Sequence, residues 1–287
     1  MTHTFLDGCL PEDDFTRETV ELLESSAVSF STLYTAGDMP VLKWDDAFEQ
    51  FLERRGNVLE DMLLDGCPLF PWREPRTNLY FSQGNTPSCM GHADDFAYRS
   101  SLLMSIGLGA PLRWDVTDPY QTWLLSKNGN TRGGQSVGVM ANFANKYGHV
   151  IQGSKRASDQ HQSAIVFLSG TGSVLADKIR RCNRAGLGVA LGNSTAVNGT
   201  MVDRNEVQVA VLGGTWAHAT SFNAWFKRNG QEYVFWTNSH DKRYVKATFG
   251  EPADGAWMRV DGELVSFLQT APRYGMPYAC LSEASFC

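Results

Sequence analysis

The sequence predicts an α+β protein with a helical first part and a second part built from antiparallel strands. Asp45 to Leu64 carries apolar residues at the 3.6-residue spacing of an amphipathic helix, and a Gly-Cys-Pro turn follows it. From Ala164 onward, short apolar or β-branched runs alternate with Gly and Asn, a pattern typical of antiparallel strands. A helical lobe beside a β lobe leaves a cleft in which a site is expected.

The expected elements follow one another along the chain. Residues 1–67 are rich in Asp and Glu and predict helices that are broken by a turn at 37–40. Three further helices are expected at 89–106, 136–147 and 173–184, with a short extended stretch at 78–81. Strands are expected at 164–168, 207–212, 218–226 and 233–236. We therefore expect a helical N-terminal extension at 1–67 and a body at 68–287, with a helical lobe at about 85–160 and a β lobe at about 161–287.

Composition excludes several classes of protein. The chain has 25 basic and 31 acidic side chains and a formal net charge of −6, which argues against a nucleic-acid partner. No apolar run approaches the roughly 18 residues that cross a bilayer, and the first residues do not resemble a secretory signal. We expect no membrane partner and a cytoplasmic location, or a place in a viral particle if the chain is an assembly component.

The polar and sulfur-containing residues carry few metal or disulfide signals. Six cysteines lie far apart without a CxxC pair, which argues against a zinc ribbon and a disulfide framework. Asn193 and Asn198 fit the pattern of a glycosylation acceptor, but they are expected to be polar loop residues. His149 and His161 are expected at the surface.

Cys89 is the cysteine whose surroundings predict chemistry. It follows a turn-rich loop and opens an expected helix, where the positive end of the helix dipole favours a thiolate. The carboxamide of Gln83, six residues earlier, could donate with the Cys89 N–H to a developing oxyanion. His92 lies one turn after Cys89, but no second pair has ligand spacing, so no metal is expected.

Several motifs resemble, in order, those of the papain-like cysteine peptidases, with the closest likeness to the bleomycin-hydrolase branch. They are Pro71-Trp72-Arg73-Glu74, Gln83 before Cys89, Gly133-Gly134 before a helix that ends at Lys146-Tyr147-Gly148, Trp216-Ala217-His218-Ala219, and Asn238-Ser239. The resemblance implies a papain-like two-lobe fold and a peptidase that needs no cofactor.

The resemblance also implies a role for each residue of the site. Cys89 would be the nucleophile in a thiolate–imidazolium pair with His218, which Asn238 would orient, while Gln83 would stabilise the oxyanion. Gly133, Gly134 and Ala217 would contact an extended peptide or protein substrate.

Two departures leave other functions open. Met90 and His240 stand where the family usually has tryptophans, and residues 1–67 do not match the helical pattern of the family's inhibitory propeptides. The alternative function is a papain-fold structural or assembly protein, in a viral particle, with a vestigial site and a protein partner bound through the extension. A further alternative makes residues 1–67 an intramolecular inhibitor that is cleaved near Cys67-Pro68. Taken alone, Cys89 or His218 would be an ordinary core residue.

The hairpin that joins the two expected site strands permits a prediction of register. A two-residue turn at Asn229-Gly230 would leave His218 three residues out of register with Asn238. We therefore expect a four-residue loop at 227–230 or a bulge in one of the strands.

Overall fold

A mostly antiparallel seven-stranded sheet forms the centre of the protein. The computed structural model describes residues 9–11, 13–32, 39–63, 66–68, 82–107, 116–154, 160–240 and 254–286. The strand order is β1-β4-β9-β5-β6-β7-β8, in which β1 runs parallel to β4. These strands are β1 (Val41–Leu42), β4 (Ala164–Phe167), β9 (Tyr278–Leu281), β5 (Val189–Val202), β6 (Gln208–Arg228), β7 (Gln231–Thr237) and β8 (Gly255–Arg259). A separate pair is formed by β2 (His149–Val150) and β3 (Gln160–His161).

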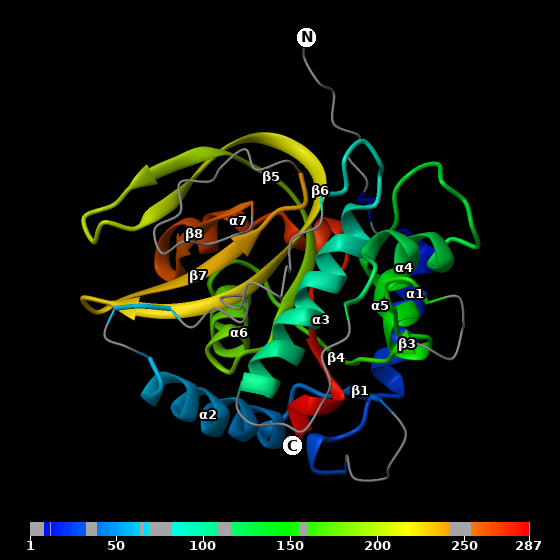
Figure 1. The fold of residues 1–287 in the computed structure, drawn as a ribbon, viewed down its shortest axis with the longest axis horizontal. Coiled ribbons are helices and arrows are strands. Elements are labelled where there is room, and N and C mark those ends of the chain that lie inside the picture. Colours follow the sequence, from blue (N-terminus) through cyan, green and yellow to red (C-terminus); the bar gives the residue numbers. More distant parts are fainter. Residues whose placement is uncertain are drawn as a thin grey trace.

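The helices divide around the long helix α3. In Figure 1, α1, α4 and α5 gather on one side of α3, and strands β5 to β8 spread on the other. The helices are α1 (Asp14–Ser25), α2 (Asp46–Asp61), α3 (Cys89–Gly107), α4 (Pro119–Ser126), α5 (Val137–Lys146), α6 (Gly172–Arg184) and α7 (Val265–Phe267). Short helical turns occur at η1 (Phe30–Thr32), η2 (Val260–Leu264), η3 (Ala271–Tyr274) and η4 (Glu283–Phe286). The predicted α+β class is confirmed.

Side-chain caps explain why several helices begin where they do. Asp45 accepts from the Phe48 N–H at 3.0 Å and starts α2, and Asp13 accepts from the Thr16 N–H at 2.8 Å and starts α1. The expected helix at 45–64 is thus confirmed from residue 46. Its apolar stripe is narrower than predicted, because Val58 is 52% exposed. Among the described residues, no helix is both long and apolar enough to span a membrane.

The strand prediction needs two corrections. The runs at 207–212 and 218–226 belong to one continuous strand, β6, and Asn193 and Asn198 lie in β5 rather than in a loop. Both differences follow from pairing between β5 and β6, which contains several register shifts. Polar residues and glycines are accepted in a strand when a neighbouring strand satisfies the backbone and a bulge relieves the strain.

The β6–β7 hairpin was predicted with either a wider loop or a bulge, and only the bulge is present. Arg228 pairs with Gln231 across a two-residue turn, in which Asn229 and Gly230 have φ values of 51° and 79°. The wider loop is therefore wrong. The register shifts by one residue between Phe222 and Ala224, so the correction is made within the strand.

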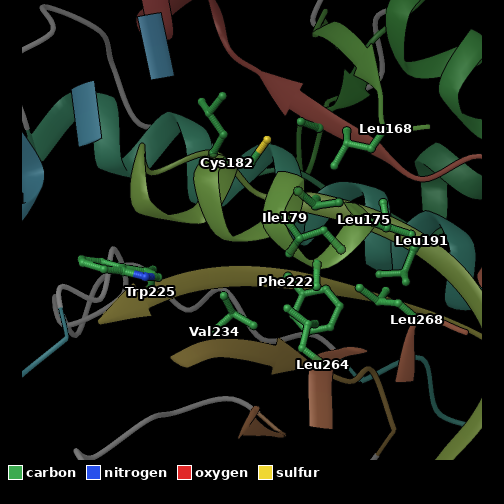
Figure 2. Packing of buried hydrophobic residues seen from close by; sticks show 14 of the residues in the cluster. Leu168, Leu175, Ile179, Cys182, Leu191, Phe222, Trp225, Val234, Leu264 and Leu268 are labelled. Carbon is green, nitrogen blue, oxygen red and sulfur yellow. The ribbon is translucent and has the colours of Figure 1, made fainter. Parts of the chain in front are cut away.

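The sheet and the flanking helices enclose the main hydrophobic core. Figure 2 shows Ile179 of α6 directed toward Phe222 of β6, with Leu264 nearby. Phe48 and Leu52 of α2 belong to the same cluster and are buried. The described part of the extension is therefore packed into the core of the body.

Ion pairs join α2 to α6 at the edge of this core. Arg181 lies 3.1 Å from Glu49, and Arg184 lies 2.8 Å from Glu60. These groups are partly exposed, so each pair contributes at most about 1 kcal/mol. These two ion pairs fix how α2 lies against α6, and they add little to the free energy of unfolding.

His149 was expected at the surface but is fully buried, whereas His161 is half-buried. His149 Nε2 lies 2.8 Å from Asp94 Oδ2, and the Tyr278 hydroxyl donates to Asp94 Oδ1 at 2.7 Å. Burial disfavours the charged ring, but Asp94 overcomes this effect and raises the pKa of His149. A buried His–Asp pair, together with the Tyr278 hydroxyl, thus ties α3 to β2 and β9.

Loss of this buried pair should destabilise the protein strongly. We expect Asp94→Ala to lower the free energy of unfolding by about 3–5 kcal/mol, because it leaves the buried His149 ring and the Tyr278 hydroxyl without their partner. Urea denaturation measures the change. Asp14→Ala is the matched control: it removes an exposed carboxylate 3.2 Å from Arg17 and should cost less than about 1 kcal/mol. Equal effects of the two substitutions would contradict this prediction.

Candidate active site

Cys89 is the first residue of α3 and is fully buried. The start of this helix is held against α4, because a Cβ at Gly91 would lie only 2.5 Å from Trp123 Cβ. The positive end of the helix dipole therefore acts on a thiol whose position is fixed by close packing.

His218 on β6 and Asn238, just after β7, are joined by a short hydrogen bond. His218 Nε2 lies 2.6 Å from Asn238 Oδ1, which also accepts from the Ser239 N–H at 2.9 Å. Since this atom accepts a backbone N–H, it is the amide oxygen, and His218 Nε2 must carry the hydrogen. In the neutral ring Nδ1 then holds a lone pair. Nδ1 is buried and has no hydrogen-bond partner among the residues that the structure describes.

Gln83 is anchored to the residue that follows Asn238. The Gln83 N–H donates to Ser239 O at 2.8 Å, and the Ser239 hydroxyl donates to Gln83 Oε1. Gln83 Nε2 donates one hydrogen to Thr86 O at 2.8 Å and carries a second one, which the expected oxyanion role requires. The loop before Cys89 is thus bound to the end of β7.

His92 lies one turn after Cys89 and approaches the same place from α3. Its Nδ1 lies 3.0 Å from Ser88 O, and burial lowers the pKa of His92 to about 4. His92 also contributes to the lowered pKa of His218. Gln83 and His92 thus lie on either side of Cys89 along the chain, and α3, which carries His92, packs on the strand that carries His218. In the described part of the chain, no group of three or more His, Cys, Asp or Glu side chains is arranged to hold a metal.

The ring of His218 is covered by aromatic neighbours. His240 stacks on it with ring centroids 4.4 Å apart, and Trp216 contacts it at 4.7 Å. Burial, followed by the effect of His240, lowers the pKa of His218 to about 3, although the bond to Asn238 opposes this shift. His218 is therefore neutral at neutral pH in this closed state, whereas the resemblance implied an imidazolium.

Cys9 and Leu10, near the start of the chain, connect β6 with the residue that precedes α5. The Cys9 N–H donates to Ala217 O at 3.3 Å, and the Leu10 N–H donates to Gln135 O at 3.0 Å. The Cys9 side chain is only 3% exposed and packs on Gly192, where an added Cβ would lie 2.4 Å from the Cys9 sulfur. Burial, and then proximity to Cys89, raises the pKa of Cys9. The backbone at Cys9 and Leu10 is thus held from two sides, near Cys89.

The residues expected to bind substrate are only partly those that contact this segment. Ala217 accepts a backbone hydrogen bond, but on the opposite wall the acceptor is Gln135 rather than Gly133 or Gly134. Gly133 is exposed with a φ of 67°, its carbonyl accepts from Lys127 at 2.6 Å, and Gly134 is buried. The two glycines form the turn that brings Gln135 to the cleft. The expected motif at 71–74 and the stretch at 78–81 lie outside the described residues.

The structure is thus an α+β protein in which a helix that begins at a cysteine packs on the strand that carries the His218–Asn238 hydrogen bond. No protein-family profile matches the sequence, and no curated protein matches it either.

Three solved structures of cysteine-protease proforms are similar to most of the chain. Digestive procathepsin L2 from the larval midgut of Tenebrio molitor has 14% identity and a TM-score of 0.49, and covers 93% of this chain and 90% of its own. Procathepsin B S9 from Trypanosoma congolense has 10% identity and a TM-score of 0.48, with coverages of 96% and 100%. The proform of the ragweed pollen allergen Amb a 11, a cysteine protease, has 12% identity and a TM-score of 0.49, with coverages of 92% and 77%. The function of the chain must be argued from its own site.

The lowered pKa values of His92 and His218 predict that the protein loses stability in mild acid. In the unfolded chain both rings have the ordinary histidine pKa of 6.5, so as the pH falls the unfolded chain binds protons on these rings before the folded chain does. The contribution of each neutral, buried ring to the stability of the fold is fully present above pH 6.5. It is lost as the pH falls toward about 4 for His92 and about 3 for His218. At pH 5 each ring should lower the free energy of unfolding by about 2 kcal/mol.

Urea denaturation at pH 7.5 and pH 5 tests this prediction. His92→Gln removes one of the two titrating rings, so its acid loss should be about 2 kcal/mol smaller than that of the unaltered chain. The same acid loss in both proteins would show that His92 is not buried in its neutral form. His149 does not account for a loss of stability in acid, because its pKa is raised and its protonation favours the folded state.

Proposed function

We propose that the chain is a cysteine peptidase that hydrolyses peptide bonds through an acyl-enzyme intermediate. The observation that carries the proposal is the hydrogen bond between His218 Nε2 and Asn238 Oδ1, at 2.6 Å. This bond leaves the buried Nδ1 as the basic atom of the ring. Strand β6, which carries His218, packs against α3, which begins at Cys89. A base held in one tautomer beside a thiol is the arrangement that nucleophilic catalysis requires.

Each step follows from these positions. His218 Nδ1 takes the thiol proton, and the Cys89 sulfur forms a bond to the carbonyl carbon of the substrate. The Cys89 N–H and the second Nε2 hydrogen of Gln83 stabilise the resulting oxyanion. The imidazolium of His218 then gives its proton to the departing amine as the C–N bond breaks and a thioester remains. Water, deprotonated by His218, cleaves the thioester and restores the thiol.

The occupied cleft supports an extended peptide as the ligand. Cys9 and Leu10 donate backbone hydrogen bonds to Ala217 O and Gln135 O, groups that any peptide could use in the same way. Gly192 has no side chain, and the space is filled by the small side chain of Cys9. A peptide with a small apolar residue at this position is the favoured substrate class.

The alternative function, a structural or assembly protein with a vestigial site, rests on different observations. His218 is neutral and buried, His240 covers it, and the N-terminal segment fills the cleft. A vestigial site would leave Cys89 no more reactive than the other cysteines. Selective labelling of Cys89 by a thiol-directed electrophile, in a chain from which residues 1–11 are removed, therefore separates the two functions.

Cys89→Ala should reduce peptide hydrolysis by about 10⁴-fold or more, because no nucleophile remains. It should also abolish selective labelling, while circular dichroism shows an unchanged fold. Cys67→Ala, which removes a half-buried thiol at another place, is the matched control and should keep full activity. Hydrolysis that survives in Cys89→Ala would exclude the proposed mechanism.

The N-terminal segment also supports a regulatory role, as an inhibitor within the same chain. Cleavage near Cys67 with loss of the whole segment before it would remove Phe48, Leu52 and strand β1 from the core and the sheet. The part of the chain that we propose as the inhibitor is therefore residues 9–25 only. Helix α1 in this segment is held on α5 through a hydrogen bond between Thr16 Oγ1 and Ser136 Oγ at 3.1 Å. The blocking residues themselves are Cys9 and Leu10.

Deletion of residues 1–11 should open the site while leaving α1 in place. Water would then reach His218 and raise its pKa toward the ordinary value, which favours the ion pair with Cys89. We expect alkylation of Cys89 and peptide hydrolysis at pH 7 to increase by about tenfold or more. Leu22→Ala, on the exposed face of α1, serves as the control and should change neither rate. Unchanged rates after the deletion would mean that the segment does not block the site.

A further inference from the structure

We propose that Asp254 is a positioning residue of the same site, which holds the Asn238 amide so that its oxygen faces His218. The inference rests on the proposed function. Asp254 is fully buried and immediately precedes β8. It makes two contacts with Asn238: the Asn238 N–H donates to Asp254 O at 2.7 Å, and Asn238 Nδ2 donates to Asp254 Oδ2 at 3.1 Å.

The surroundings of Asn238 permit one orientation of its amide. Two donors, the His218 Nε2–H and the Ser239 N–H, face one end, and the Asp254 carboxylate faces the other. A flipped amide would place NH₂ against the backbone N–H and oxygen against the carboxylate, so both contacts would become repulsive. The carboxylate therefore selects the orientation that keeps the hydrogen on His218 Nε2 and the lone pair on Nδ1.

The bond to Asn238 favours protonation of His218. Burial, His240 and His92 lower the pKa of the His218 ring, and the hydrogen bond to Asn238 raises it. By holding the Asn238 oxygen toward His218, Asp254 supports the one contact that opposes this lowering.

The local backbone explains how Asp254 reaches this position. A Cβ at Gly255 would collide with Trp236 O, so β8 approaches the end of β7 more closely than a side chain would allow. Asn238 is followed by Ser239, which in turn holds Gln83. One carboxylate therefore positions both the residue that orients the base and the residue next to the oxyanion donor.

Asp254→Asn tests this role, because the new amide can accept a hydrogen bond from the Asn238 NH₂ group or donate one to the Asn238 oxygen. It therefore fits both orientations of Asn238. Nitrogen-15 NMR of the imidazole rings at pH 7 should show a single Nε2–H tautomer of His218 in the unaltered full-length chain. In Asp254→Asn a second, Nδ1–H tautomer should be populated, and kcat should fall by about 10²-fold or more with little change in KM. A merely structural role would not alter the tautomer.

Asp203→Asn is the matched control. Asp203 accepts from the Val207 N–H at 3.0 Å and from the Tyr233 hydroxyl at 2.6 Å at the turn between β5 and β6. It should leave the His218 tautomer unchanged. Identical His218 spectra for Asp254→Asn and the unaltered chain, or equal changes in both variants, would overturn the proposal. Two tautomers in the unaltered chain would also overturn it, without any need for the variant to fold.

The tautomer is measured without substrate, so this test separates two failures. If the chain without residues 1–11 hydrolyses no peptide and its Cys89 is not labelled selectively, the proposed function fails, but the NMR spectra of the unaltered chain still decide whether Asp254 orients Asn238. If hydrolysis is present and the tautomer does not respond to Asp254→Asn, only the present inference fails.

Discussion

The hydrogen bond between His218 and Asn238 is the interaction on which the rest of the site depends. It joins β6 to the end of β7, so it requires a particular register of the hairpin between them. The two-residue turn at Asn229-Gly230 sets one register, and the shift between Phe222 and Ala224 changes it by one residue. Because side chains alternate between the two faces of a strand, a slip of one residue would separate the pair.

Burial is the second constraint, and it opposes the first. The same closure that keeps His218 dry and orders its bond to Asn238 lowers the pKa of the ring to about 3. The ring is therefore well ordered and poorly protonated. Access of water to the ring would raise its pKa and favour protonation. Occupancy and protonation are thus coupled through the solvation of one imidazole.

Local signals in the sequence predicted the elements that form from local interactions. Helix α3 from Cys89, α6 and strand β4 were predicted because caps, periodicity and apolar runs act over a few residues. The prediction failed at Asn193 and Asn198, and at His149. Each of these polar residues lies in a strand, and His149 is satisfied by Asp94, more than 50 residues away in the sequence. No local pattern shows that such a partner exists.

The site divides in the same way. The order of residues along the chain was enough to predict that Gln83 precedes a cysteine at a helix start, and that His218 and Asn238 come from the two arms of a hairpin. It gave no sign that Cys9 pairs with Gln135 or that Asp254 faces the amide of Asn238. These contacts depend on how strands and helices pack, and packing brings together residues that share no pattern along the chain.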